Sequence, residues 1–303
     1  MKIRYREPNH EVNKGKPETL YTFFSNVLIL GLSMAGLLTA IKLIFSFAAP
    51  FVPYSFEYYP GMLFRNSLAA SYLPNEHNAS LLLTEEANRI RESFAPQIPS
   101  IQANVICSPI PNAFALPGLQ IIFTSALLKE LEKPEEFYLV LGHEIGHIVN
   151  RDNLELLGEM FFQIVFSVAV KPFVGSDGGW VLSTANTWTS RGFSRNQELE
   201  ADEFGMGVIS KLFTDPEEGL SLFTKFKAFI KKMSGKEEGE ISSLSSTHPL
   251  SDKRTAKAES FLKNHPSVEA NTFVSRFLEL KTLGVDGCKE RLSQKKRQDA
   301  ELR

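Results

Sequence analysis

Cysteine is scarce in this chain of 303 residues: only Cys107 and Cys288 occur, far apart in the sequence. This scarcity excludes a disulfide-rich framework, and the two cysteines form no metal-binding motif. A single disulfide between them is possible in an oxidising compartment. An excess of basic residues is also missing, because 33 lysines and arginines are interspersed with 35 aspartates and glutamates. The sequence therefore gives no indication of nucleic-acid binding.

Charge is absent altogether from residues 19–41, and the apolar character resumes after Lys42 and continues to residue 52. A membrane span needs about 20 such residues. We therefore expect a membrane anchor at residues 21–48. Basic residues are concentrated ahead of the anchor, at Lys2, Arg4, Arg6, Lys14 and Lys16, whereas the first one after it is Arg65.

This asymmetry predicts the orientation of the chain. By the positive-inside rule, residues 1–20 stay in the cytoplasm and the remainder is exported. We expect a single pass through a cell inner membrane with a periplasmic domain, and a mitochondrial inner membrane is the alternative. Secretion after signal cleavage is a third interpretation, because residues 46–48 (Ser-Phe-Ala) could be a cleavage site. The apolar stretch is, however, longer than the usual signal core of about 7–15 residues.

Residues 143–147 (His-Glu-Ile-Gly-His) match the pattern H-E-x-x-H, which on a helix is typical of zinc peptidases. From the composition, chance would produce about 0.014 such matches per chain. Pro134 and the two glutamates after it are typical of a first helical turn. Residues four apart share one helix face, so His143 and His147 can meet one metal ion while Glu144 lies beside it.

A catalytic zinc ion usually has three protein ligands, so a third must come from elsewhere in the chain. The acidic stretch 195–205 is the best source, because Glu198 and Asp202 are again four residues apart. One carboxylate could bind the metal while the other orients a ligand. Glu200 remains a competing ligand, and a solvated acidic helix face is the alternative to any role of this stretch.

Four ordered motifs resemble those of a family of membrane-linked zinc metallopeptidases that includes HtpX, the CAAX prenyl proteases and the mitochondrial Oma-type proteases. They are residues 112–118 (Asn-Ala-Phe-Ala-Leu-Pro-Gly), the H-E-x-x-H pentapeptide, the E-x-E-A-D stretch from Glu198 to Asp202, and residues 247–249 (Thr-His-Pro) with Asp252 and Arg254. The resemblance covers roughly residues 65–265, and four motifs in order make it specific. The chain departs from the pattern at Leu119, where many relatives carry a second glycine, so the resemblance does not predict the backbone shape of that loop.

The resemblance implies His143, His147 and Glu198 as ligands of one zinc ion per chain, with Asp202 orienting a ligand. It implies Glu144 as the catalytic carboxylate, which would take a proton from the attacking water and deliver it to the leaving amine. Arg191, Arg195 and His248 are the candidates for stabilising the tetrahedral oxyanion of the reaction. We rank His248 first because it lies in a matching motif, and a structural or surface role is the equal alternative for it.

The implied fold is α+β: a predominantly helical, zincin-like metalloprotease domain with a small β-sheet, preceded by one N-terminal transmembrane helix. We expect the peptidase domain at residues 60–270 and a charged helix or tail at residues 271–303. Helices are expected at 84–94, with Thr84 as N-cap, and at 125–131, 197–211 and 216–233. Strands are expected at 101–107, 113–116 and 120–124, with a hairpin turn between the last two. The strand at 120–124 is the candidate platform for an extended substrate.

A second apolar stretch, residues 160–174, is interrupted by Lys171 and Pro172 and is short for a span. We expect a buried helix there, and the alternative is a segment that dips into the bilayer or lies along its surface. A second crossing is excluded, because it would separate Glu198 from His143 across the membrane.

Three functions fit these observations. The first is a membrane-anchored zinc metalloendopeptidase that hydrolyses peptide bonds of unfolded, damaged or membrane-associated proteins, in quality control or processing. The second is a catalytically weak chaperone or binding module, whose fourth zinc position would be filled, for example by His248. The third is a zinc hydrolase that does not cut peptides. Glu144 favours the first, because a structural zinc site needs no such carboxylate. The expected partners are protein or peptide substrates and the lipid bilayer, and the oligomeric state leaves no trace in the sequence.

Overall fold

The computed structural model describes residues 19–48, 51–58, 61–62, 77–154, 157–158, 193–233, 248, 252–265 and 273–301. The chain divides into two compact units, Met1–Ile44 and Phe45–Arg303. The basic residues expected to flank the anchor at 1–18 and the apolar stretch 160–174 lie outside the described residues.

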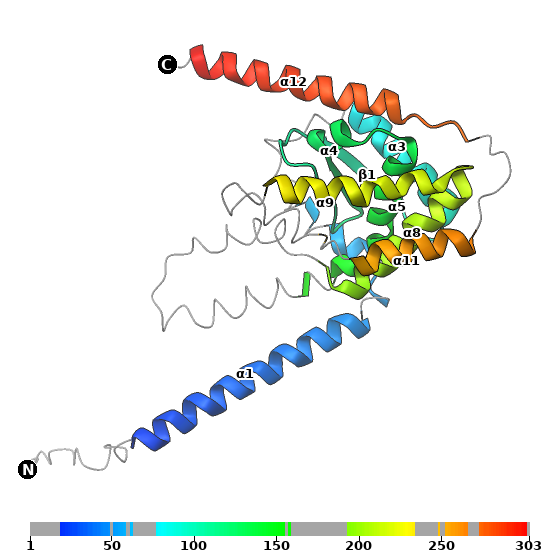
Figure 1. Cartoon of the computed structure of the whole chain (residues 1–303). Coiled ribbons are helices and arrows are strands. Elements are labelled where there is room, and N and C mark those ends of the chain that lie inside the picture. The colour runs from blue at the N-terminus through cyan, green and yellow to red at the C-terminus, as the bar shows by residue number, and fades with distance from the viewer. Residues whose placement is uncertain are drawn as a thin grey trace, which may run out of the picture. The chain divides into compact units, whose positions relative to one another are not determined.

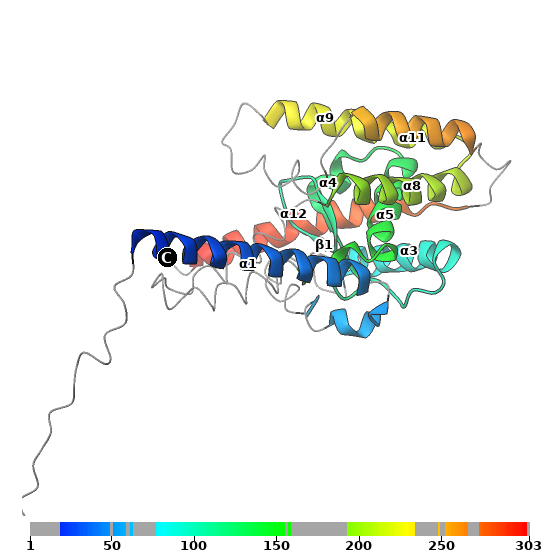
Figure 2. The ribbon, with the colours of Figure 1, turned by 90° about the horizontal axis from the view of Figure 1, so that it is seen from below.

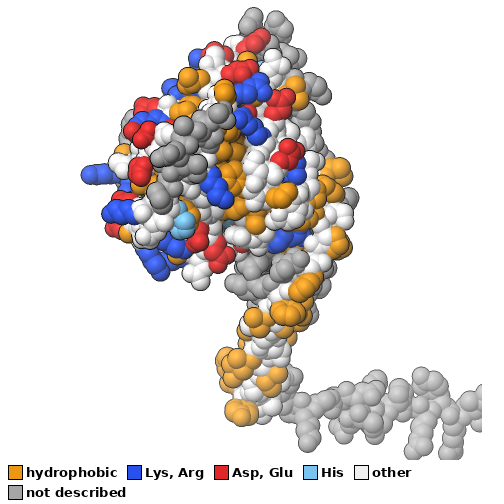
Figure 3. Space-filling model, turned by 90° about the vertical axis from the view of Figure 1, so that its right-hand side faces the viewer, with side chains coloured by type: hydrophobic (Ala, Val, Ile, Leu, Met, Phe, Trp, Pro, Cys, Tyr) orange, Lys and Arg blue, Asp and Glu red, His pale blue; other side chains and the backbone are white. Residues whose placement is uncertain are grey.

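The described part of the first unit belongs to one long helix, α1 (Leu20–Ala48), which continues into the second unit (Figure 1). Its window Leu20–Ile41 is the one place in the described residues that is long and apolar enough to cross a bilayer. Figure 3 shows its described side chains as apolar or uncharged, with no acidic or basic group among them. By length and composition, α1 therefore agrees with the expected apolar anchor.

A three-stranded sheet lies in the second unit, in the order β1-β3-β2. The strand β1 (Gln102–Ile106) pairs parallel with β3 (Gln120–Thr124), and β2 (Ala113–Leu116) pairs antiparallel with β3. This confirms the predicted hairpin between the last two strands. The prediction that β3 offers a platform for substrate is wrong, because β3 is central and both of its edges are already paired.

The hairpin turn settles the backbone shape at Leu119. Gly118 and Leu119 both adopt positive φ, 80° and 60°, which is the left-handed region that favours glycine. Leu119 has the same kind of backbone that a second glycine would give, at a cost of roughly 1–2 kcal/mol. Its side chain is 1% exposed, so burial in the core offsets that cost.

Two helices cover the sheet near its β1 edge. Helix α3 (Asn78–Phe94) begins six residues earlier than predicted, with His77 as N-cap. The Thr84 hydroxyl instead donates to the Ala103 carbonyl at 2.8 Å, which ties α3 to β1. Helix α12 (Phe277–Glu301) adds Phe277 and Leu280 to the core. A disulfide joins its Cys288 to Cys107 after β1, so the pairing left open by the sequence is formed.

The two helices that carry the predicted site pack at near backbone contact. They are α5 (Pro134–Val149) and α8 (Arg195–Leu212). A Cβ added at Gly142 would lie 2.9 Å from the Gly205 Cα, and one added at Gly146 would lie 3.0 Å from the Ala201 Cα. Small residues at these four positions therefore allow the close approach that brings the histidines of α5 against the carboxylates of α8.

The ends of both helices follow from local sequence. Pro134 starts α5, and the fully buried Glu136 carboxylate accepts hydrogen bonds from the Glu132 and Lys133 N–H groups, at 2.7 and 3.2 Å. Ser194 caps α8 in a reciprocal pair of hydrogen bonds with Gln197. Both starts agree with the predicted helices within about two residues, which is the usual precision for helix ends.

The remaining elements close one side of the domain. The predicted helix 216–233 is divided into a 3₁₀ turn, η4 (Pro216–Leu220), and α9 (Ser221–Met233), and a further helix, α11 (Asp252–Asn264), was not expected. Figure 2 shows α9 and α11 at the top of the view, followed downward by α8, α5 and α3. The short helix α4 (Ser125–Glu130) follows β3 directly. The predicted fold class, a mostly helical domain with a small sheet, is confirmed.

Candidate metal centre

His143 and His147 project from the same face of α5, and the structure brings their Nε2 atoms to 3.1 Å. Both side chains are buried. Their Nδ1 atoms face carboxylates: Asp202 Oδ1 at 3.0 Å from His143 and Asp152 Oδ2 at 2.7 Å from His147. Because a carboxylate can only accept, each neutral imidazole carries its hydrogen on Nδ1 and directs the lone pair of Nε2 toward the other ring.

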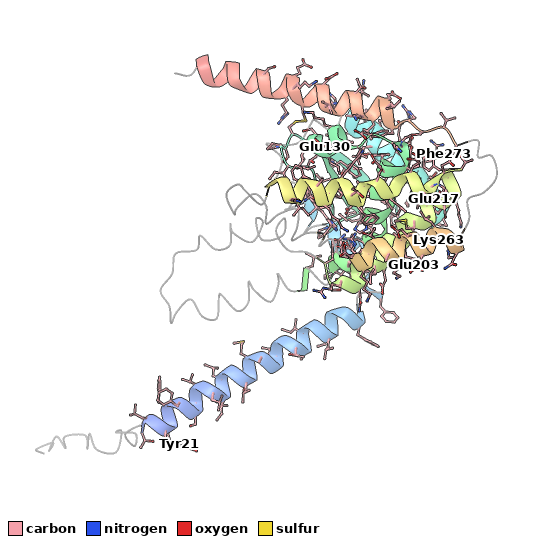
Figure 4. All side chains as sticks on the ribbon, viewed as in Figure 1. Tyr21, Glu130, Glu203, Glu217, Lys263 and Phe273 are labelled. Atoms are coloured by element: carbon pink, nitrogen blue, oxygen red, sulfur yellow. A yellow bond between two sulfur atoms is a disulfide. The ribbon has the colours of Figure 1, made fainter. Side chains whose placement is uncertain are left out.

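Glu198 and His248 complete the cluster. Glu198 Oε1 lies 3.6 Å from His147 Nε2, and Oε2 lies 3.6 Å from His143 Nε2. His248 Nδ1 lies 3.2 Å from His143 Nε2 and 2.9 Å from Glu198 Oε1. One donor atom from each of the four residues falls within 4.8 Å of every other. In Figure 4, nitrogen and oxygen atoms crowd together beside α8 and α11.

These distances fit a metal ion. A tetrahedral zinc site with bonds of about 2.0–2.1 Å has neighbouring donor atoms about 3.3–3.4 Å apart. The Nε2 atoms of His143 and His147 are 3.1 Å apart, and each lies 3.6 Å from a different oxygen of Glu198, Oε2 for His143 and Oε1 for His147. Facing lone pairs repel unless a cation lies between them, so the donor set is suited to a divalent ion that accepts imidazole nitrogen and carboxylate oxygen.

Arg254 of α11 holds both carboxylates of α8. Its Nε and Nη2 each lie 2.7 Å from the Asp202 oxygens, and its Nη1 lies 2.5 Å from Glu198 Oε2. Burial favours the neutral acids, but His248 and His147 hold the pKa of Glu198 well below its usual range. Burial is likewise outweighed at Asp202, where Arg254 and His143 lower the pKa. Both carboxylates are therefore charged at neutral pH.

The two imidazoles of α5 differ in their affinity for protons. Burial and the neighbouring His147 lower the pKa of His143, despite the carboxylate of Asp202. Burial also opposes the charge of His147, but Asp152 and Glu198 outweigh it and raise its pKa to about 9. The charged form of His147 is therefore favoured in the absence of a metal, and metal binding has to release its proton.

Glu144 lies beside this cluster with 1% of its surface exposed. Its Oε1 is 3.6 Å from His248 Nε2, and its Oε2 has no hydrogen-bond partner in the described part of the chain. Both residues line a cleft of about 560 Å³, open solvent included. The cleft also has apolar walls from α5 and α9: Leu139, Val140, Leu222, Phe223, Phe226 and Ile230.

The structure thus brings together all six residues predicted for the site: His143, Glu144, His147, Glu198, Asp202 and His248. Glu200, the competing ligand, is exposed, and Arg195 is exposed and does not line the cleft. Arg191 lies outside the described residues.

Sequence reasoning missed the roles of Asp152 and Arg254. A signal existed for the first, because a metal-binding histidine almost always donates its second N–H to a partner. Asp152 is the first acidic residue after His147. Arg254 belongs to the late motif, but only the packing of α11 against α8 brings its guanidinium to Asp202 and Glu198.

Several curated relatives share much of this chain. The mitochondrial metalloendopeptidase OMA1 of Schizosaccharomyces pombe is 29% identical over 192 residues, which cover 63% of this chain and 55% of the relative. The β-barrel assembly-enhancing protease of Yersinia pestis is 26% identical over 196 residues, 59% of this chain and 38% of the relative. Protease HtpX homolog 2 of Methanosarcina mazei is 28% identical over 244 residues, 63% of this chain and 81% of the relative.

The match to the first two relatives spans about half of their length or less. A family model, described as peptidase family M48, matches residues 81–262. That range is more than half of the chain. It contains Glu144, the four residues of the metal centre, and their partners Asp152, Asp202 and Arg254. The chain therefore belongs to peptidase family M48.

Proposed function

We propose that this protein is a zinc-dependent metalloendopeptidase. The observation that carries the proposal is Glu144, a buried carboxylate with an unpartnered oxygen at the edge of the metal centre and on an open cleft. A merely structural metal site has no use for such a group, and its burial would cost about 1–3 kcal/mol of unsatisfied hydrogen bonding. Membership of the family and the names of the relatives support the same activity.

His143, His147 and Glu198 would hold the zinc ion, which when bound supplies a Lewis acid that polarises the scissile carbonyl and acidifies water. Asp202 and Asp152 accept from the two Nδ1–H groups, so each Nε2 would be free to bind the metal. Glu144 accepts a proton from the attacking water and then delivers it to the leaving amine, which is general base and then general acid catalysis.

His248 is our candidate for stabilising the oxyanion. Burial opposes its charge, but Glu198 and Glu144 outweigh burial and raise its pKa above the ordinary value of an imidazole. Its Nε2 has no hydrogen-bond partner in the described residues, and the side chain lines the cleft. A charged N–H at this position can donate to the oxygen on which negative charge develops.

Substrate would bind as an extended strand at β2. Because β3 is central, the remaining edge beside the cleft belongs to β2, whose first residue Ala113 lines the cleft together with Asn112. Strand addition uses main-chain hydrogen bonds and reads little side-chain sequence. This mode suits unfolded, damaged or membrane-associated proteins, which offer extended backbone.

Membrane anchoring is the second part of the proposal. The apolar window of α1 has the length of a span, and the basic residues ahead of it favour a cytoplasmic N-terminus. The disulfide between Cys107 and Cys288 supports a domain in an oxidising compartment, because cytosolic thiols are kept reduced. We infer an inner membrane with the peptidase domain on the outer side. A signal peptide passes the same test of length and composition as α1, so the mature N-terminus distinguishes the two.

The decisive experiment compares zinc content and cleavage of a disordered protein between wild type and Glu144→Gln. We expect equal zinc and a loss of cleavage of about 10²–10⁴-fold, the usual contribution of a general acid–base group. Equal cleavage by both proteins would refute the mechanism. For the ligands, Glu198→Ala should lose zinc while the matched Glu200→Ala, changed at an exposed position of the same helix, retains it.

A catalytically weak binding module is the second candidate, and the position of His248 favours it. The Nδ1 atom of His248 lies within the donor cluster, so it could fill the fourth position of the metal. Zinc bound at one ion per chain, with no cleavage by wild type or by Glu144→Gln, would establish this function instead.

A further inference from the structure

The segment that follows α1 presents large apolar side chains to the outside. Phe51 and Phe56 are 77% and 74% exposed, and Tyr58 and Met62 are each 49% exposed. Glu57 is the one charged residue in positions 51–62, and it is buried. The exposed side chains described in this segment are uncharged and, apart from Ser55, mainly apolar, which is unusual for a surface in contact with water.

Arg151 fixes the inward face of the segment to the end of α5. Its Nη2 donates to the Val52 carbonyl at 2.5 Å, its Nη1 lies 3.0 Å from Glu57 Oε1, and its guanidinium stacks on the Tyr54 ring with 3.8 Å to the centroid. The side chain is buried. Three separate contacts from one rigid guanidinium hold the 3₁₀ turn η2 (Tyr54–Glu57) against the domain.

The hairpin turn after β2 is the second attachment. Gly118 N–H lies 3.4 Å from Glu57 Oε2, and Gly61 packs so closely on the turn that an added Cβ would overlap the Pro117 carbonyl. In Figure 2 the described part of this segment is the short light-blue turn, separate from the dark blue helix α1. The exposed aromatic residues therefore belong to a fixed surface of the domain.

The backbone of Arg151 indicates that this attachment is under constraint. Its φ of 64° lies in the left-handed region, which costs a residue with a side chain about 1–2 kcal/mol. Such conformations persist where the surroundings over-determine them. The next residue is Asp152, which orients His147, so the same turn holds both the segment and a metal-binding imidazole.

Phe51 lies three residues after Ala48, the end of α1, so their Cα atoms are at most about 10 Å apart. The exposed side chains Leu43, Ile44 and Phe47 continue the apolar character up to that end. If the window Leu20–Ile41 of α1 spans the bilayer, the seven helical residues after it and the link to Phe51 keep the segment within about 20 Å of the bilayer boundary. Aromatic residues concentrate there, because the ring is apolar and a tyrosine tip is polar.

We propose that residues 51–58 and 61–62 form a membrane-surface contact of the peptidase domain, with Phe51, Phe56, Tyr58 and Met62 inserted at the headgroup boundary. The proposal rests on the membrane anchoring proposed above and adds a second, structured attachment to it. Through Arg151 and Asp152, this contact holds the metal centre at a set distance from the bilayer. Substrates would then be limited to segments that extend from the membrane by that distance.

Depth-dependent fluorescence quenching tests the proposal on the full chain in phosphatidylcholine vesicles. Single cysteines are introduced as Phe56→Cys, Leu278→Cys and Leu30→Cys and labelled with an environment-sensitive dye, since both native cysteines are held in the disulfide. Leu278 is the matched control, because it is an apolar residue on α12 with 67% exposure. Nitroxide lipids carry the quencher either at the headgroup or deep in the chain.

We expect the headgroup quencher to reduce the Phe56→Cys signal at least threefold more than the Leu278→Cys signal, and the deep quencher to act on Leu30→Cys. Equal quenching of Phe56→Cys and Leu278→Cys, with Leu30→Cys quenched by the deep lipid, would overturn the membrane-surface contact and leave the anchor intact. No quenching of any label would overturn the anchor as well. Equal zinc content of the three variants checks that each one is folded.

Discussion

The carboxylate of Asp152 offers the sharpest test of how the metal centre is built. It accepts the Nδ1–H of His147 at 2.7 Å, and the exposed fractions of the two residues are 4% and 0%. In Asp152→Ala the imidazole keeps its buried N–H without a partner, which costs about 1–3 kcal/mol. If that cost falls on metal binding, the zinc dissociation constant rises by roughly 5–150-fold, since about 1.4 kcal/mol is tenfold. Loss of an outer-shell partner typically weakens metal affinity about 10–100-fold, in agreement.

Competition with a chromophoric chelator measures this affinity directly. Asp152→Asn should have a smaller effect than Asp152→Ala, because the amide oxygen still accepts a hydrogen bond but carries no charge. Asp286→Asn, on an exposed side chain of α12, serves as the matched control and should leave the affinity unchanged. An unaltered zinc affinity in a folded Asp152→Ala protein would refute the assigned role, as would an equal change in Asp286→Asn.

Three further outcomes follow from the packing and charges of the domain. Gly142→Ala should lower the free energy of unfolding by about 1–3 kcal/mol, because the added methyl group overpacks the contact of α5 with α8. Denaturant unfolding measures this change, and an unchanged midpoint would contradict the prediction. The disulfide Cys107–Cys288 joins residues 181 positions apart, so its reduction should lower the free energy of unfolding by about 2–5 kcal/mol and with it the thermal midpoint. Cys288→Ser should show the same lower midpoint, and a reducing agent should not lower it further. The pKa of Glu136 is lowered because Lys225 and other donors outweigh its burial, so its contribution to stability is complete above its unfolded value of 4.5 and is lost as the pH falls through the folded value. Glu136→Gln should therefore destabilise the protein by about 1–3 kcal/mol at pH 7, since Lys225 keeps Glu132 as a partner, and progressively less below pH 4.5; a constant difference across that range would rule out the ionised carboxylate as the cause.

The parts of the site that the sequence predicts are those with local geometry. Two histidines, or Glu198 and Asp202, four residues apart on a helix must share a face, so each pair could be placed without tertiary information. The meeting of the two pairs depends on the small residues between α5 and α8, which no periodicity indicates. Arg254 acts across 52 residues and from a helix that was not predicted.

The errors have equally specific causes. Thr84 resembles an N-cap in sequence but serves as a link between α3 and β1, because helix α3 already begins at Asn78. The hydrophobic pattern at residues 120–124 correctly indicates a strand, but a strand's place within a sheet depends on its partners. The disulfide also depends on tertiary contacts, because the spacing of cysteines along the chain does not predict which thiols meet.

The order of the site along the chain has a consequence for biosynthesis. His143 and His248 are 105 residues apart, and Arg254 follows still later, so the metal centre requires a late portion of the chain. At about 5–20 residues per second, roughly 5–20 s separate the synthesis of the first ligand from that of the last side chain in the cluster. A nascent chain therefore carries an incomplete centre while its own unfolded segments are within reach. If the proposed peptidase needs Arg254 to hold the two carboxylates of α8, the nascent chain stays inactive until α11 has been synthesised.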